Sequence, residues 1–260
     1  MKSLFSIFLF CLSWQLFAQT HPSVGTWERT SGDTLQSLKI ITPTHWALVT
    51  HQIKKDGSKE FVRACVGTYT ITNDTYIEKI DMASWDEDLS KIKTNFTYKV
   101  TGDTFHQKGT LTLSDGTKYD LDEKWQKAKL AGQNNPGIGT WNQLTSSGVR
   151  ANGEKWSHTS ATHIRYMTIS PTHYIIIRKK DNQFEDVLAG TYRIEGNKFI
   201  PNWEFNSQPV IEELKLEVVQ RIESGKLLWE GKMVDKEGTH TWKDVYEKVN
   251  GKTSKTASTK

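Results

Sequence analysis

The chain contains almost no cysteine. Its 260 residues include two cysteines, and Cys11 lies in an apolar N-terminal stretch that resembles an export signal. If that stretch is removed, Cys65 alone remains and no intramolecular disulfide can form, which excludes a disulfide framework. The sequence has no Cys-Xaa-Xaa-Cys pair either. We therefore interpret Cys65 as a small buried hydrophobic residue rather than a reactive thiol.

Signatures of catalysis and metal binding are also missing. The sequence has no His-Glu-Xaa-Xaa-His motif, no Gly-Xaa-Ser-Xaa-Gly elbow and no glycine-rich phosphate loop. The closest histidine pairs, His45/His51 and His158/His163, have no acidic residue beside them at the spacing of a metal ligand. We expect no metal, no cofactor and no enzymatic activity.

Outside the C-terminus, no region has a clear excess of charge of one sign. The formal net charge is +4, and 248–260 holds four lysines and no acid. Elsewhere acidic and basic residues are interspersed, so no basic stripe indicates nucleic-acid binding. We predict that 250–260 is a disordered basic tail. No apolar run after the N-terminal stretch is long enough to span a membrane.

The first 18 residues have the pattern of a secretory signal peptide. Lys2 precedes an apolar core, Leu4–Leu12, and the stretch ends in the small residue Ala18. We therefore expect export, cleavage after Ala18, and a mature protein in the periplasm or outside the cell.

Four short blocks occur twice, in the same order. Their copies are separated by 114, 128, 123 and 121 positions, a drift that loop insertions and deletions produce. A repeat of about 100 residues has the size of a domain. The paired blocks are Gly25-Thr26-Trp27 and Gly139-Thr140-Trp141, Thr42-Pro43-Thr44-His45 and Ser170-Pro171-Thr172-His173, Gly67-Thr68-Tyr69 and Gly190-Thr191-Tyr192, and Glu123-Lys124-Trp125 and Asp244-Val245-Tyr246.

Strand patterns fill both copies. Short segments rich in β-branched and aromatic residues alternate with turns such as Asp115-Gly116, and no window shows a persuasive helical period. Each copy has about eight such segments. Tight turns favour an up-and-down barrel over a sandwich, which needs longer crossovers. We predict an all-β fold of two tandem antiparallel barrels, 24–128 and 138–249, joined by the linker 129–137.

The repeated blocks resemble those of a known family. A Gly-Xaa-Trp at the start of an eight-stranded barrel is the lipocalin signature. The Thr/Ser-Pro-Thr-His and Gly-Thr-Tyr blocks, followed by Tyr76-Ile77-Glu78, are similar to the bacterial lipocalin-like domain of exported proteins. The resemblance covers 24–128 well and 138–249 less well, and it implies a small barrel that holds a small molecule. Trp27 and Trp141 are expected to be core residues.

The candidate site residues are aromatic, acidic and histidine side chains. His45 and His173 either point into a barrel mouth or fix the turn that contains the proline. Tyr76 and Glu78 share one face of a strand, and an inward Glu78 needs a partner such as His106 or a lysine. The predicted ligand contacts in the first barrel are Tyr69, Tyr76, Glu78 and His106, with Tyr192, Phe199 and Trp229 as looser equivalents in the second.

Three hypotheses for function follow. The first is a non-enzymatic binder of a small apolar or amphipathic molecule. The second is an envelope-associated interaction module with filled barrels, and the third is an enzyme with Glu78 and a histidine as acid and base. Because the second copy has Phe199 and Pro201 where the first has Tyr76 and Glu78, polar ligand contacts are expected in the first barrel. The insertion 146–162 is expected to lie over a mouth of the second.

Overall fold

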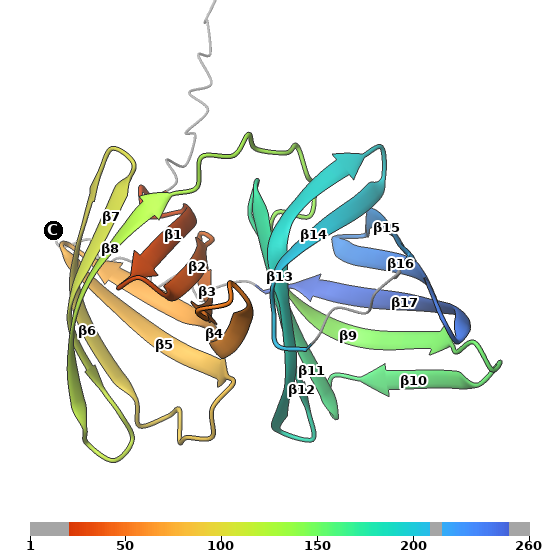
Figure 1. Cartoon of the computed structure of the whole chain (residues 1–260), viewed down its shortest axis with the longest axis horizontal. Coiled ribbons are helices and arrows are strands. Elements are labelled where there is room, and N and C mark those ends of the chain that lie inside the picture. The colour runs from red at the N-terminus through yellow and green to blue at the C-terminus, as the bar shows by residue number, and fades with distance from the viewer. Residues whose placement is uncertain (1–20, 209–214, 250–260) are drawn as a thin grey trace, which may run out of the picture.

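The chain folds into two closed antiparallel β-barrels that lie side by side (Figure 1). A computed structural model describes residues 21–208 and 215–249, and all regular structure in these ranges is β-strand. This confirms the predicted all-β fold with two tandem barrels. The predicted signal peptide, 1–18, and the predicted tail, 250–260, lie outside the described residues. None of the described residues forms a helix long and apolar enough to cross a membrane.

The first barrel has eight strands, each paired with the next in the sequence. It closes where β8 pairs with β1, at Trp27–Lys127 and Glu28–Gln126. The strands are β1 (Gly25–Ser31), β2 (Leu35–Ile41), β3 (His45–Ile53), β4 (Lys59–Thr72), β5 (Thr75–Ala83), β6 (Lys93–Thr101), β7 (Thr104–Thr112) and β8 (Lys118–Lys127).

The second barrel has the same order with one additional strand. It closes where the last strand pairs with the first along most of their length. The additional strand lies in the insertion 146–162 and pairs with the far end of the first. The strands are β9 (Gly139–Val149), β10 (Lys155–Thr159), β11 (His163–Ile169), β12 (His173–Lys180), β13 (Gln183–Glu195), β14 (Lys198–Asn206), β15 (Lys215–Glu223), β16 (Lys226–Asp235) and β17 (Gly238–Lys248).

The glycine of each Gly-Thr-Tyr block sits at a β-bulge. The register between β4 and β5 shifts at Gly67, and that between β13 and β14 shifts at Gly190. A Cβ at Gly67 would lie 1.8 Å from the carbonyl oxygen of Lys79, and one at Gly190 would lie 2.1 Å from that of Asn202. Only glycine allows the neighbouring backbone to approach so closely.

The two barrels pack through an apolar interface. Outward side chains of β2–β5 in the first barrel meet those of β12–β14 in the second, and all are fully or nearly fully buried. His51 extends this contact, since its ring stacks on Phe205 at 5.2 Å and its Nε2 lies 3.0 Å from the carbonyl oxygen of Asn206. The interface is built from Leu38, Ile40, Ala47, Val49, Ala64, Val66 and Met82 on one side and Ile175, Ile177, Val187, Ala189 and Phe205 on the other.

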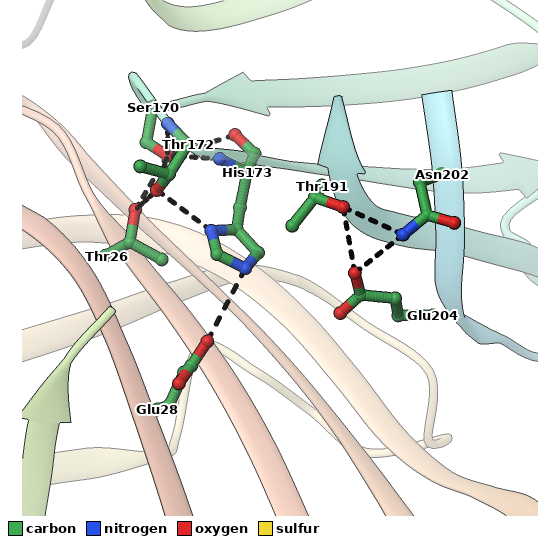
Figure 2. Close-up of polar contacts among 8 residues, drawn as sticks. All are labelled: Thr26, Glu28, Ser170, Thr172, His173, Thr191, Asn202 and Glu204. Carbon is green, nitrogen blue, oxygen red and sulfur yellow. Dashed lines mark hydrogen bonds and ion pairs between the residues drawn. The ribbon is translucent and has the colours of Figure 1, made fainter. Parts of the chain in front are cut away.

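A polar cluster lies beside this apolar interface (Figure 2). The Thr26 hydroxyl donates to Ser170 Oγ at 2.7 Å, and the Thr172 hydroxyl donates to Thr26 at 3.1 Å. His173 Nε2, in the second barrel, lies 3.5 Å from the carboxylate of Glu28, in the first. The two copies are thus joined by both apolar and directional contacts.

Candidate ligand-binding site

The first barrel contains a closed polar cluster at its centre. The Lys39 ammonium donates hydrogen bonds to the Glu78 carboxylate and, at 3.0 Å, to Gln107 Oε1. Lys39 is 2% exposed and Gln107 is 1% exposed. Four aromatic rings surround the ammonium at 5.1–5.9 Å from their centroids: those of Trp46, Tyr76, Phe105 and Trp125.

This cluster pairs two buried charges with each other. Burial raises the pKa of Glu78, and the adjacent Lys39 ammonium opposes that shift. A buried charge is tolerated when a partner of opposite sign and hydrogen bonds replace its hydration. Tyr76 and Glu78 therefore point into the barrel, and of the two partners that the sequence suggested for Glu78, His106 or a lysine, the structure shows a lysine, Lys39.

His106 does not belong to this interior, which corrects the prediction made for it. Phe105 and Gln107 on either side of it are buried, so alternation along β7 turns His106 outward. Its Nε2 lies 2.6 Å from Asp122 on the outer face, and its side chain is 35% exposed. His106 was predicted to face the pocket because it lies in the middle of a strand. That position alone does not show which face of the strand points into the barrel.

His45 and His173 lie at turns rather than in a barrel mouth. The backbone N–H of His45 donates to Thr42 Oγ1 at 3.1 Å, and that of His173 donates to Ser170 Oγ at 2.9 Å. Each ring Nδ1 lies within 2.9 Å of the hydroxyl of the threonine that precedes the histidine. The sequence left two alternatives open for these histidines, and the structure shows the second: both residues fix the turn that contains the proline.

Tyr69 and Tyr192 anchor the same turns. The Tyr69 hydroxyl donates to the carbonyl oxygen of Thr42 at 2.7 Å, and the Tyr192 hydroxyl donates to that of Ser170 at 2.6 Å. Both phenols thus have a protein partner. Their recurrence in the two copies is explained by this bond between the Gly-Thr-Tyr block and the Thr/Ser-Pro-Thr-His block.

Cys65 is buried in the first barrel, and burial raises the pKa of its thiol to about 12. A thiol with so high a pKa is not ionised at neutral pH and is a poor nucleophile. This confirms the interpretation of Cys65 as a small hydrophobic residue.

The second barrel contains a cavity of about 590 Å³. One part of the wall is apolar and aromatic, and it includes Phe199 and Trp229, which were predicted from the sequence. Apolar and aromatic side chains of this wall are Tyr174, Ile176, Leu188, Phe199, Val218 and Trp229. The polar ligand contacts were expected in the first barrel, whereas this cavity lies in the second.

Differences between the two copies explain why the second barrel has a cavity where the first is filled. Tyr76 pairs with Phe96 in the first barrel as Phe199 pairs with Val218 in the second, so a valine replaces a phenylalanine ring. The same correspondence places Pro201 at the position of Glu78. Because the long Lys39 side chain aligns with Met167, the second barrel has no equivalent of the closed polar cluster.

A buried carboxylate on β17 organises the polar wall of the cavity. Asp244 is fully buried and accepts hydrogen bonds from the Ser146 hydroxyl, from Arg165 Nη1 at 2.8 Å and from the Tyr246 hydroxyl at 3.1 Å. In the first barrel the equivalent Glu123 pairs with Arg29 of the first strand. The second barrel draws its arginine from β11 instead, and Gln143 occupies the position of Arg29.

A second arginine lies beside the first. Arg165 on β11 and Arg178 on β12 are register partners, and Arg178 forms a two-fold hydrogen-bonded ion pair with Asp186. Both arginines line the cavity. At the equivalent positions the first barrel has only two hydroxyls, Ser37 and Thr50, which hydrogen-bond to each other at 2.9 Å.

Several buried polar atoms of the cavity wall have no protein partner within the described part of the chain. They include two N–H donors, Gln143 Nε2 and Arg165 Nε, together with the hydroxyl of Tyr174. Burial raises the pKa of Tyr174, so its hydroxyl keeps its proton. Asn206 Oδ1, an acceptor at the end of β14, is the fourth such atom. Buried polar groups are nearly always satisfied, so these atoms indicate a place for a ligand or water.

The insertion 146–162 contributes to the open end of the cavity. Trp156 and His158 of β10 stack at 5.0 Å, and His158 stacks on His163 at 3.8 Å. Burial and the neighbouring His163 lower the pKa of His158, which favours the neutral ring. The other polar residues of this rim are Arg150, Lys179, Lys180 and Glu185. The insertion therefore lies at the cavity, as the sequence predicted.

Within 21–208 and 215–249, no three His, Cys, Asp or Glu side chains come together as metal ligands would. The polar wall formed by Gln143, Arg165, Tyr174 and Asp244 was not predicted from the sequence. Strand alternation could have indicated two of these residues: Arg165 shares the face of Met167 and Ile169, and Asp244 shares that of Tyr246, so both are charges at inward positions.

Comparison with known proteins adds little. No protein-family model matches the chain, and no curated protein matches it. Among solved structures, the chain is similar to the crystal structure of a protein with unknown function from the DUF3598 family of Nostoc punctiforme. The TM-score is 0.30 at 11% identity, over 88% of this chain and 97% of that one.

Proposed function

We propose that this chain is a lipocalin-like, non-enzymatic binding protein that holds a small amphipathic molecule in its second barrel. The observation that carries the proposal is the cavity of about 590 Å³, with aromatic and aliphatic walls and a few buried polar groups. Ligand pockets typically measure roughly 300–1,000 Å³ and combine apolar walls with a few placed polar groups. The first barrel, whose centre is filled by Lys39, Glu78 and aromatic rings, serves as a scaffold.

The chemistry of the wall supports an amphipathic ligand rather than a purely apolar one. Ile176, Val218 and Trp229 present an apolar surface on which a hydrocarbon or aromatic body would be desolvated. Gln143 and Arg165 present unpaired donors that such a body leaves unsatisfied. A molecule with both an apolar part and a hydrogen-bonding group fits both surfaces. The signal-like N-terminal sequence supports the further proposal that binding takes place after export.

The proposal is tested by filling the cavity. The probe is the neutral fluorophore N-phenyl-1-naphthylamine, titrated into the full chain. Val218→Phe introduces the residue that the first barrel has at the equivalent position, Phe96, and should abolish binding by occupying the cavity. The matched control is Ile222→Phe on the same strand, where the side chain is 38% exposed and outside the cavity lining.

Probe binding by wild type and by Ile222→Phe, together with its loss in Val218→Phe, would support the second barrel as the site. A wild-type chain that leaves the probe fluorescence unchanged would contradict the proposed function. Unchanged binding in Val218→Phe would contradict the location. Circular dichroism on all three proteins establishes that each variant keeps its fold.

A further inference from the structure

We propose that the ligand of the second-barrel cavity is a carboxylic acid, whose carboxylate accepts hydrogen bonds from Gln143 Nε2 and Arg165 Nε. This inference rests on the proposed function and adds the chemical class of the ligand. Two observations support it. One part of the cavity wall has unpaired hydrogen-bond donors, and the two buried aspartates already accept hydrogen bonds from other side chains of the protein.

The two donors come from neighbouring strands. β9 pairs with β11 through Asn142–Tyr166 and Trp141–Met167, so Gln143 and Arg165 face the interior next to each other. Each has a buried N–H without a protein partner. A buried donor without an acceptor destabilises the protein, and a ligand acceptor would remove this cost. The two oxygens of a carboxylate match two such donors.

The aspartates of the wall cannot serve a cationic ligand as well. Asp244 already accepts from Ser146, Arg165 and Tyr246. Asp186 is held by both nitrogens that Arg178 presents to it. With both buried carboxylates satisfied by the protein, and with Glu185 exposed at the rim, an ammonium group that reaches the interior of the cavity would lose its hydration without a buried counter-charge to replace it.

The charges around the cavity also favour an anion over a neutral acceptor. Its lining contains five cationic side chains and three carboxylates, which leaves two positive charges when the histidines are neutral. The excess lies at the rim, where Lys180 and Arg150 are exposed and would attract an anion. The Tyr174 hydroxyl, on the neighbouring β12, is a third unpartnered donor in the lining of the cavity.

The experiment compares three molecules that share one chain and differ in the head group. Decanoate, 1-decanol and decylamine are titrated at pH 8 against the full chain, by displacement of N-phenyl-1-naphthylamine. Decanoate should bind about tenfold more tightly than decanol, since the negative charge of the carboxylate strengthens the hydrogen bonds that it accepts. Decylamine should bind most weakly.

A conservative variant ties the preference to the donor. Gln143→Met keeps the length of the side chain, removes the unpaired N–H, and should reduce decanoate affinity about tenfold while leaving decanol affinity unchanged. Gln143→Glu should reduce it further by repelling the carboxylate. The matched control is Gln126→Met, at an exposed position of the first barrel, which should change neither affinity.

The outcomes separate this inference from the proposed function. If decanol binds as tightly as decanoate, or if Gln143→Met weakens both equally, the carboxylate assignment is overturned while a binding cavity remains. If neither decanoate nor the fluorophore binds the wild type, both proposals fall. Selective loss of decanoate affinity in Gln143→Met supports the assignment, because a general loss of packing would affect decanol as well.

Discussion

The hydroxyl of Thr26 in the first barrel donates a hydrogen bond of 2.7 Å to Ser170 in the second. The reciprocal pair, Thr140 of the second barrel and Thr42 of the first, lies at 3.3 Å. Each Gly-Thr-Trp block thus contacts the turn of the other barrel, and this reciprocity gives the contact between the two copies an approximate two-fold symmetry. The recurrence of both blocks therefore has a reason in the contact between the barrels as well as within each one.

The apolar interface predicts different effects for substitutions at two adjacent residues. Ile175 is buried between the barrels, whereas Ile176 lines the cavity. Ile175→Ala should lower the free energy of unfolding by about 2–5 kcal/mol, because it leaves a void in a packed contact. Ile176→Ala should lower it less, since the cavity already borders that side chain, and should change ligand affinity instead. Urea denaturation and titration with N-phenyl-1-naphthylamine measure the two effects, and equal destabilisation would contradict this division.

The buried charges of the first barrel should depend on each other. Lys39→Met leaves Glu78 without a counter-charge and should lower the free energy of unfolding by about 3–5 kcal/mol near neutral pH. The double variant Lys39→Met/Glu78→Gln removes both charges of this pair, and more than half of that loss should be recovered. Urea denaturation of the wild type, both single variants and the double variant gives the coupling energy. Additive effects would show that the pair is not coupled.

The fold could be predicted because its signals are local and repeated. Hairpin turns such as Asp115-Gly116 and the alternation of β-rich segments specify neighbouring antiparallel strands, and the ordered blocks specify two copies. Proline cannot donate a hydrogen bond to a neighbouring strand, and β14 pairs with β15 only at Lys198 and Phe199, just before Pro201. Such features depend on a few adjacent residues, so they can be read without a structure.

The site could not be predicted with the same success, because it depends on contacts distant in sequence. Glu78 was expected to contact a ligand, but Lys39 satisfies it from three strands away. The cavity exists because Val218 and Met167 stand where the first barrel has the larger Phe96 and the charged Lys39. A single sequence does not show how much space such differences leave inside a barrel. Alternation did indicate that Arg165 faces inward, but not that Asp244, 79 positions later, is its partner.

The bulge glycines predict a stability effect that is shared by both barrels. Gly67→Ala would place a methyl group 1.8 Å from the Lys79 carbonyl oxygen, and Gly190→Ala one 2.1 Å from that of Asn202. Because backbone atoms must move in each case, both variants should lose at least about 2 kcal/mol of unfolding free energy. Gly57→Ala, in an open turn with no atom within 4 Å of the added methyl group, is the control for the clash. Equal losses at all three positions would indicate a general effect of replacing glycine.

The interface histidine predicts a loss of stability in acid. Burial lowers the pKa of His173 to about 4, with nearby Glu204 opposing the shift. Between pH 6.5 and 4 the unfolded chain therefore binds a proton that the folded chain excludes, and stability falls as pH decreases through this window. Glu28, which faces His173 from β1, has a pKa raised by burial and by Glu204, so it acts in the opposite direction. The net loss from His173 is at most about 3 kcal/mol.

His173→Gln isolates this contribution, because glutamine has no proton to gain in the unfolded state. Urea midpoints measured at intervals from pH 7 to pH 4 should fall more steeply for the wild type than for His173→Gln. Glu28→Gln should steepen the decline instead, since it removes the group that favours the folded state in acid. His106→Gln is the control: His106 lies on the outer face beside Asp122, so its replacement should leave the His173-dependent difference intact. Identical pH profiles for the wild type and His173→Gln would show that His173 is not the residue that couples protonation to unfolding.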